Sequence, residues 1–489
     1  MFIAAHEWSQ PGAKIGTENY LTLSPIEHQG ATAKFYNRLV EARPDTALRI
    51  RAAEFLQSQI AQLDSERCDL PESAHDLEAW MYSGAQMATA KYSAYLEERK
   101  GGAPRRFFSN RAQALYFLRA VAPTKLVDGA WLYGLTAHWK NSRLSNLVRT
   151  YVEELGDGAA DKNHVVLYRR LLARYGLDTA EDLDDPFYTQ GLIQLALAFN
   201  AESFLPELIG FNLGYEQLPL HLLITAFELN ELGLDPYYFT LHVTVDNTDT
   251  GHARRAVQAV LDNLPRLQSA DDFWQRVRLG YQLSNAGVGT AEVIAGFDIE
   301  QEAVRILSRK SIAGHGAHSD YCRVGGRNVN DWLAQPEDVP AFLAALERTG
   351  WIKRGAPVEQ SRFWGLLQGD RAEMFGVFSQ YELQTIHDWI RGSASADGRA
   401  YTERSSGAEA ARLPSFRAAT RLAAARGHAP LVNAPDHEIL DADLQTLIQQ
   451  LAVRDDAGQA ALLIEAMAPS EHWTPAGLHA TRLFCALAS

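Results

Sequence analysis

The segment YYFTLHVTVDNTDTGHARRA, residues 237–256, concentrates potential metal ligands in an otherwise apolar stretch. The four polar side chains of interest are His242, Asp246, Asp249 and His252. If the segment is one α-helix, turning about 100° per residue, the first three share a face and His252 lies about 60° away. Divalent iron accepts mixed imidazole and carboxylate ligands. The spacing therefore predicts a metal site, and the alternative is a solvated polar stripe with a turn.

Two segments upstream offer further ligands. YVEELGDGAADKNHVVLYRRLL contains Glu154 and His164 on either side of Gly-Asp-Gly. An uninterrupted helix would leave these side chains about 80° apart, so we expect the glycines to permit a bend that brings them together. GFNLGYEQLPLHLL places Glu216 in apolar surroundings, where a carboxylate is costly to bury unless it is paired or binds metal. Glu228 and Glu231 are alternatives to Glu216, and the first pair could instead lie on exposed helix ends.

The composition narrows the class of protein. The 489 residues carry a net charge of −14, which disfavours binding to nucleic acid, and 46% of them are hydrophobic, enough for a large core. No apolar run approaches the roughly 20 residues that cross a bilayer, and MFIAAHEWSQPGAK lacks the features of a signal peptide. Three widely spaced cysteines indicate a reducing compartment. We therefore expect a cytoplasmic protein that does not bind membranes.

Apolar residues recur at three- and four-residue spacing along most of the chain, which predicts a mainly α fold. Breaks such as GGAPRR and a Gly-rich polar stretch after residue 300 suggest three parts. These are an N-terminal helical region at 1–100, a ligand-bearing helical domain at 101–300 and a C-terminal, mainly helical domain at 301–489. We predict no chemistry for the last part, which could position substrate, bind a partner or support a homodimer.

A second cluster of potential ligands lies in that C-terminal part. The sequence HGAHSDYC contains His315, His318 and Cys322, which are types of residue that bind zinc. A fourth ligand at the usual spacing is missing. We therefore favour a lid or contact loop over a zinc site here.

Taken in order, the three ligand-bearing segments resemble the heme-oxygenase-like diiron oxidases and oxygenases, a family of iron-containing redox enzymes. The family pattern is a Glu and a His on one helix, a Glu on a second, and His-x-x-x-Asp-x-x-His on a third. Glu154-Leu-Gly-Asp-Gly followed by His164 resembles the first element, Glu216 the second, and His242-Val-Thr-Val-Asp246 the start of the third. The resemblance covers roughly residues 105–265.

This resemblance implies a heme-oxygenase-like helical bundle with helical regions on both sides. It implies two Fe(II) ions, with O2 as co-substrate, and oxidation of a small amine or carboxylate by N-oxygenation, hydroxylation or oxidative C–C cleavage. The implied metal ligands are the residues matched above together with His252. By family analogy, we expect a role in specialised metabolism.

The chain departs from the family pattern at the last histidine. Asp249 stands at that position, three residues after Asp246, and the next histidine is His252. We favour His252 because Gly-His-Ala resembles the family's continuation. By the same resemblance, Asp128 in KLVDGAWLYG could be an additional carboxylate ligand of the kind that some N-oxygenating members use, and a helix-end or core role is the alternative.

Two other classes of protein remain alternatives. One is a metal-free enzyme with the heme-oxygenase-like fold, although the absence of cysteine between Cys68 and Cys322 argues against a thiol-dependent version. The other is a helical binding or scaffold protein. It predicts that His164, His242 and His252 are far apart or exposed, whereas a metal site requires them to converge.

Overall fold

The computed structural model describes residues 30–41, 44–63, 68–177, 183–245, 248, 251–267, 269–368, 372–392 and 441–488. These residues are mostly helical. Their strands are the two-residue β1 (Arg323–Val324) and β2 (Arg327–Asn328), which pair antiparallel. The predicted mainly α class is confirmed. Within the described ranges, no helix is long and apolar enough to cross a bilayer.

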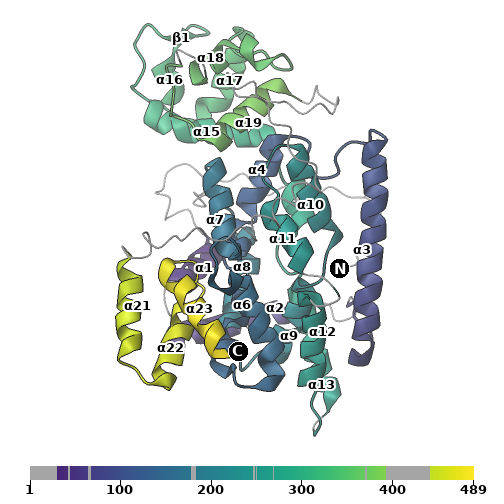
Figure 1. Ribbon diagram of the computed structural model, residues 1–489. Coiled ribbons are helices and arrows are strands. Elements are labelled where there is room, and N and C mark those ends of the chain that lie inside the picture. Colours follow the sequence, from purple (N-terminus) through teal and green to yellow (C-terminus); the bar gives the residue numbers. More distant parts are fainter. Residues whose placement is uncertain are drawn as a thin grey trace.

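A helical bundle occupies the centre of the molecule (Figure 1). Its α-helices are α4 (Arg111–Ala120), α5 (Ala122–Lys125), α6 (Ser145–Glu154), α7 (His164–Tyr175), α8 (Thr189–Phe199), α9 (Leu205–Tyr215), α10 (Leu220–Glu231), α11 (Tyr237–Val245), α12 (His252–Asn263) and α13 (Ala270–Leu283). Short 3-10 helices connect them: η3 (Ala130–His138), η4 (Ser142–Leu144), η5 (Gly156–Gly158) and η6 (Asp185–Tyr188).

Small residues allow the bundle helices to cross closely. A Cβ atom on Gly210 of α9 would lie 1.9 Å from the carbonyl oxygen of Val277 in α13, and a Cβ on Gly280 would lie 1.9 Å from that of Glu207. Any larger side chain would therefore push these two helices apart. The close crossing fixes α9, the helix that leads into Glu216.

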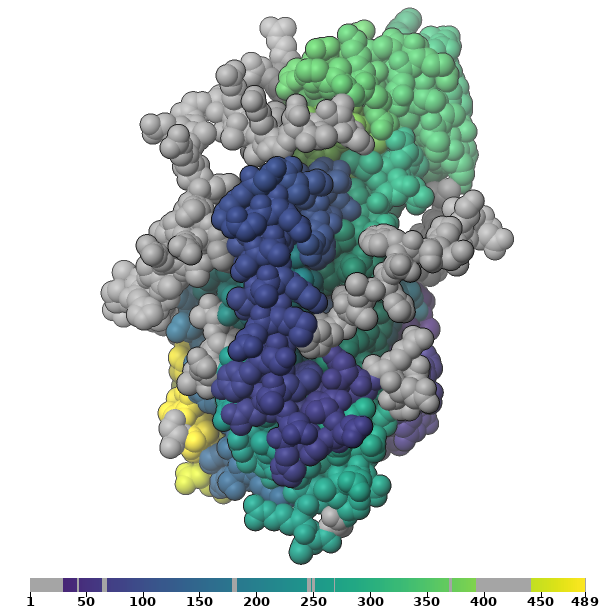
Figure 2. Space-filling view, turned by 90° about the vertical axis from the view of Figure 1, so that its right-hand side faces the viewer, coloured from purple at the N-terminus to yellow at the C-terminus, as the bar shows by residue number. Residues whose placement is uncertain are grey.

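N-terminal helices cover two sides of the bundle. The first two, α1 (Ala31–Glu41) and α2 (Thr46–Ile60), pack against α8. After η2 (Ala74–Asp76) comes α3 (Leu77–Lys100), which stands at the edge of the molecule and in front of the face shown in Figure 2. It contacts α10 and α12.

The C-terminal residues contact the bundle at two separate places (Figure 1). One group of helices lies over α4: α14 (Thr290–Ala295), α15 (Ile299–Gly314), α16 (Val329–Leu333), η7 (Pro336–Asp338), α17 (Val339–Arg348), η8 (Val358–Gln360), α18 (Arg362–Leu367) and α19 (Gln380–Arg391). The other group is α21 (Ala442–Ala452), α22 (Asp456–Ala466) and α23 (Pro475–Ala488), which returns to the side of the bundle near α6. The predicted boundaries at residues 100 and 300 stay predictions.

One sequence-based expectation about the helices is wrong. Residues 237–256 do not form a single helix, because α11 ends at Val245 and α12 begins at His252. Gly251 precedes α12 in an extended conformation, with φ −81° and ψ −167°. Thr248 and Gly251, the described residues between the two helices, are both non-helical, and Thr and Gly are weak helix formers. His242 and His252 therefore lie on different helices.

Candidate metal centre

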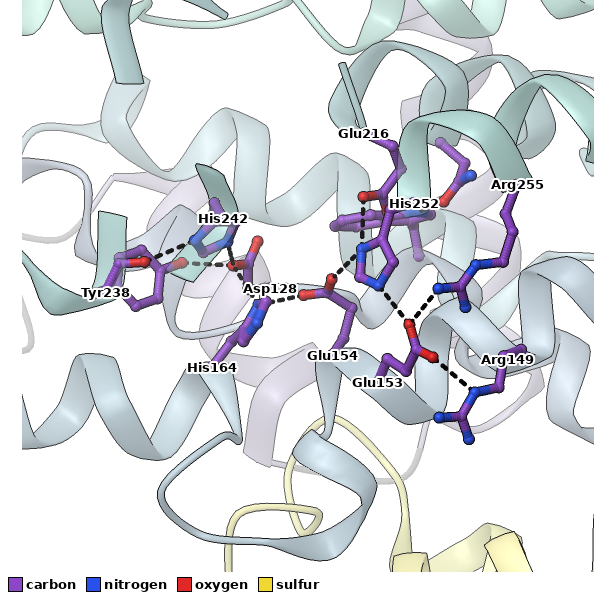
Figure 3. A network of polar contacts seen from close by, with 12 residues as sticks. Asp128, Arg149, Glu153, Glu154, His164, Glu216, Tyr238, His242, His252 and Arg255 are labelled. Carbon is purple, nitrogen blue, oxygen red and sulfur yellow. Dashed lines mark hydrogen bonds and ion pairs between the residues drawn. The ribbon is translucent and has the colours of Figure 1, made fainter. Parts of the chain in front are cut away.

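Six side chains converge in the middle of the bundle (Figure 3). They form two groups, and within each group one potential ligand atom from every residue lies within 4.8 Å of the others. The first group is Asp128, Glu154, His164 and His242, and the second is Glu154, Glu216 and His252. Glu154 belongs to both groups. All six side chains are buried except that of His242, which is 12% exposed.

A reversal of the chain brings Glu154 and His164 together. Helix α6 ends at Glu154, and α7 begins at His164. Between them Gly156, Asp157 and Gly158 have φ angles of 66°, 52° and 80°, so three consecutive residues adopt the left-handed region. Glycine enters this region without steric cost, which explains two of the three residue types. The bend predicted from Gly-Asp-Gly is confirmed.

Asp128 reaches the centre from the loop between α5 and η3. The next residue, Gly129, has a φ angle of 80°, and a Cβ atom there would lie 2.8 Å from Cβ of Glu154. The missing side chain lets this loop pack directly against Glu154. The carboxylate of Asp128 is thereby placed beside that of Glu154.

In the first group, the Asp128 carboxylate faces two imidazoles. Its Oδ2 atom lies 3.3 Å from Nε2 of His242 and 3.6 Å from Nδ1 of His164. The hydroxyl of Tyr238 donates a hydrogen bond of 2.5 Å to the same oxygen. Nδ1 of His242 lies 2.8 Å from the backbone carbonyl of Tyr238, so it can donate there and leave Nε2 with a lone pair for a metal ion.

In the second group, His252 faces two carboxylates. Its Nδ1 atom lies 3.1 Å from Oε1 of Glu154 and 3.0 Å from Oε2 of Glu216. The other oxygen of Glu154, Oε2, contacts Nδ1 of His164 in the first group. The two oxygens of the Glu154 carboxylate thus face different groups, and this one side chain belongs to both.

The donor set fits a divalent metal ion. Nδ1 of His164 is buried and makes no hydrogen bond of acceptable geometry, although the carboxylate of Glu154 touches it. Three carboxylates and three imidazoles converge in a site shielded from water, which is costly unless cations compensate the charges. Iron in the divalent state accepts both oxygen and imidazole ligands. The candidate site is therefore compatible with iron on chemical grounds.

Charges in the first group shift several pKa values. Burial alone would lower the pKa of His164, but the nearby carboxylates of Glu154 and Asp128 raise it to about 10. Burial would raise the pKa of the Asp128 and Glu154 carboxyl groups. The positive charge of Lys125 and the imidazoles of His164 and His242 instead hold the pKa of Asp128 well below its usual range. The imidazoles of His164 and His252 likewise hold the pKa of Glu154 well below its usual range. In the metal-free protein, a proton on His164 takes the place of part of the metal charge.

We expect the metal-free protein to lose stability between about pH 6.5 and pH 10. The folded-state pKa of His164 is raised to about 10, so the stabilisation is complete below the unfolded value and disappears as pH rises through the folded value. Melting curves of the metal-free wild type across this range test the prediction. The same curves for His164→Gln provide the baseline, and a wild type that follows this baseline would contradict it. Metal must displace this proton, so iron affinity should rise with pH.

Glu153 holds the far side of the His252 ring. Its Oε2 atom lies 3.0 Å from Nε2 of His252 and 2.6 Å from Nη2 of Arg255, and its Oε1 accepts from Nε of Arg149 at 2.8 Å. Burial opposes ionisation, but these partners lower the pKa of Glu153 to about 2. An ionised carboxylate here fixes the proton on Nε2 and turns Nδ1 toward Glu154 and Glu216.

Glu153→Gln should therefore weaken iron binding about 10- to 100-fold, because an amide holds the ring less firmly and makes Nδ1 less basic. Competitive chelation under anaerobic conditions measures the change. The matched control is Glu202→Gln, which alters another histidine–glutamate pair, His138 with Glu202 at 2.9 Å, on the surface. Equal iron affinity in the two variants would show that Glu153 does not act on the site.

The structure places the remaining predicted residues as follows. Asp246 and Asp249 lie outside the described residues, so their roles stay predictions. Glu228 is buried, and its carboxylate accepts hydrogen bonds from the Tyr95 hydroxyl and from backbone N–H groups of residues 106–108. Glu231 pairs with Arg99 at 2.8 Å. Of the three glutamates considered for this position, Glu216 is the one that reaches the metal groups.

The loop containing His315, His318 and Cys322 shows no zinc-like arrangement. Nδ1 of His315 lies 3.2 Å from the Asn330 carbonyl, and the thiol of Cys322 lies 3.5 Å from the Ser319 hydroxyl. Over the described part of the chain, the metal-compatible clusters of three or more side chains are the two that share Glu154.

Sequence inspection did not identify two residues of the site. Tyr238 is one of several aromatic residues in an apolar segment, and nothing in the sequence indicates that its hydroxyl binds Asp128. Glu153 lies one position before Glu154 and could not be recognised from the sequence as part of the site. One of its partners, Arg255, lies 102 residues further along the chain, and the other, Arg149, lies four residues before it. The i, i+4 spacing of Arg149 and Glu153 is a weak sequence signal that Glu153 is ionised, next to the ligand Glu154.

Comparison with known proteins agrees with the geometry. Residues 115–285 match the family model described as iron-containing redox enzyme. This range contains all six side chains of the two groups. The heme-oxygenase-like resemblance is confirmed for this segment, and the match supports an oxidoreductase that uses iron. No curated protein and no solved structure matches the chain.

Proposed function

We propose that the protein is an O2-dependent, non-heme diiron oxygenase or oxidase that acts on a small amine or carboxylate. The observation that carries this proposal is the sharing of Glu154 between two groups of buried ligands. Each group offers at least one imidazole and one further carboxylate, so two ions can be held side by side. Bound ferrous iron would supply electrons to O2 while the substrate undergoes N-oxygenation, hydroxylation or oxidative C–C cleavage.

The side chains of the protein have separate tasks in this proposal. His164, His242 and Asp128 would hold one ion, His252 and Glu216 would hold the other, and Glu154 would serve both. The Tyr238 hydroxyl and the Glu153 carboxylate keep the ligands in place. The burial of the ligand side chains excludes bulk water, which protects reactive species from side reactions.

A cavity lined by the residues that follow Glu216 offers room for the substrate. It has a volume of about 660 Å³ and lies among α3, α10 and α14. Its wall includes Gln217 to His221, the residues that directly follow Glu216. Most of the wall is apolar, with Trp80, Met81 and Ile224, while His221 is held neutral because burial and the charge of Lys125 lower its pKa to about 4. This size and composition are typical of small-molecule sites.

Metal analysis after anaerobic loading with ferrous iron tests the proposal. Wild type should retain about two irons per chain, and His242→Ala should retain much less, because the first group loses an imidazole. His138→Ala, which removes a histidine on the surface, is the control. Oxygen consumption with candidate amines and carboxylates then follows. Wild type that retains no iron would refute the proposal and favour a metal-free enzyme or a scaffold.

A helical scaffold is the second candidate from the sequence. It requires histidines that are separated or solvated. The rings of His164 and His242 instead have centroids 4.5 Å apart, and His252 is 1% exposed. The short distance between the two rings and the burial of His252 both favour the oxidoreductase over the scaffold.

A further inference from the structure

The C-terminal helices contact the turn that brings Glu154 and His164 together. A Cβ atom on Gly158 would lie 2.4 Å from the carbonyl oxygen of Leu478 in α23, so only glycine fits between the turn and this helix. Nη1 of Arg482, also in α23, donates to the carbonyl oxygen of Gly158 at 2.9 Å. In Figure 3 the C-terminal ribbon, in yellow, lies below the segment that carries Glu154.

The helix ends on both sides of the turn have C-terminal partners as well. Asn163 caps α7 by accepting from the backbone N–H of Val166, and its Nδ2 donates to Nδ1 of His472 at 3.1 Å. Burial and nearby positive charges lower the pKa of His472 to about 3, so the ring is neutral and its Nδ1 can accept in the tautomer that carries the proton on Nε2. In α6, the hydroxyl of Tyr151 donates to the carbonyl of Met467 at 2.5 Å.

The turn itself is a conformation that needs support. Among the described residues, Asp157 is the non-glycine residue with a positive φ angle. The left-handed region is uncommon for residues other than glycine, and such conformations persist where surrounding contacts determine them. The Asp157 carboxylate pairs with Arg149 at 2.9 Å and lies 3.7 Å from the thiol of Cys485 in α23. Residues of α23 therefore contact the turn at Asp157 and Gly158, and residues 467–472, which precede α23, contact α6 and the start of α7.

We propose that residues 467–485 act as a positioning element for the metal centre, with Arg482 and His472 as the positioning residues. The proposal rests on the proposed iron-dependent function. None of these residues belongs to the two metal groups, and they lie outside the segment 115–285 that matches the redox family. They hold the turn at Gly158 and the start of α7, and thereby fix the separation between Glu154 and His164.

Two variants of the full-length chain test this role. Arg482→Ala removes the hydrogen bond to the turn, and Gly158→Ala introduces a Cβ atom that collides with α23. Both should weaken iron retention about tenfold, the lower end of the effect of losing a partner that orients ligands. Both should also speed amide hydrogen exchange of residues 155–163 in the metal-free protein. Arg482→Lys, which keeps a donor, should restore part of the retention.

Matched controls separate this effect from general strain. Gly350→Ala imposes the same backbone strain at a φ angle of 77°, but nothing lies within 4 Å of the added Cβ. Arg454→Ala removes an exposed arginine from the same C-terminal region. Neither control should change iron retention. If Gly158→Ala does not fold, iron retention and amide exchange in Arg482→Ala and Arg482→Lys test the positioning role.

The outcomes distinguish the two proposals. If wild type retains iron and Arg482→Ala retains it equally well, or if exchange of residues 155–163 is unchanged, the positioning role is wrong. If wild type retains no iron, the proposed function fails. In that case, faster exchange in Arg482→Ala would still show that α23 stabilises the turn. Unchanged exchange would show that it does not.

Discussion

Glu154→Gln should reduce bound iron from about two ions per chain to well below one, and oxygen consumption should fall with it. The reason is geometric, because each oxygen of Glu154 faces a different ligand group. An amide offers one neutral oxygen and an NH2 group that cannot bind a cation, so both groups lose a ligand or the bridging charge. The measurement is metal content after anaerobic loading, followed by O2 uptake.

A second buried carboxylate provides the control for Glu154→Gln. Glu302 is 7% exposed and is bound by Arg305 at 2.7 Å and by the Tyr381 hydroxyl, far from either ligand group in sequence. Glu302→Gln should lower stability, because Glu302 is buried and bound by two partners, but it should leave the iron content of the folded protein unchanged. Two irons retained by Glu154→Gln would refute the bridging role.

Glu228→Gln should lower the free energy of unfolding by about 2–4 kcal/mol while leaving the iron content unchanged. The Glu228 carboxylate accepts hydrogen bonds from Tyr95 through Oε1 and from the N–H groups of Phe107 and Phe108 through Oε2. Glutamine supplies one accepting oxygen, so donors on the other side face an NH2 group and lose their partner, at about 1–3 kcal/mol each. Denaturant titration of the folded protein measures the loss.

Glu231→Gln is the matched control for Glu228→Gln. Its ion pair with Arg99 is partly solvated, with 28% of the Glu231 side chain exposed, so its loss should cost less than about 1 kcal/mol. The two variants also separate Glu228 from Glu216 as a metal ligand. A drop in iron content in folded Glu228→Gln would mean that the assignment of Glu216 is mistaken.

Part of the site could be predicted because its signals are local. The Gly-Asp-Gly sequence indicated a bend, and three left-handed residues produce it. The apolar surroundings of Glu216 indicated a buried carboxylate, and it is 3% exposed. Such features depend on residues adjacent in the chain, where propensity and periodicity act directly.

Other parts of the site could not be predicted from local patterns. Helical spacing suggested that His242 and His252 share one helix, but a break near Gly251 places them in different ligand groups. The sequence offered Asp128 either as an additional carboxylate ligand or as a helix-end or core residue, and local spacing does not choose between them. Its loop packs against Glu154 only because of Gly129, a contact between residues 25 positions apart.

The sequence by itself determined that the protein is mainly α-helical and which residue types could bind iron, because helical periodicity and ligand chemistry are properties of short segments. Tertiary structure decided that Glu154 lies between two groups, that Glu153 orients His252, and that α23 supports the turn beside Glu154. These depend on how helices distant in the chain pack together. Gly158 and Leu478 are in contact although they lie 320 residues apart in the chain, and the periodicity of either segment does not predict this contact.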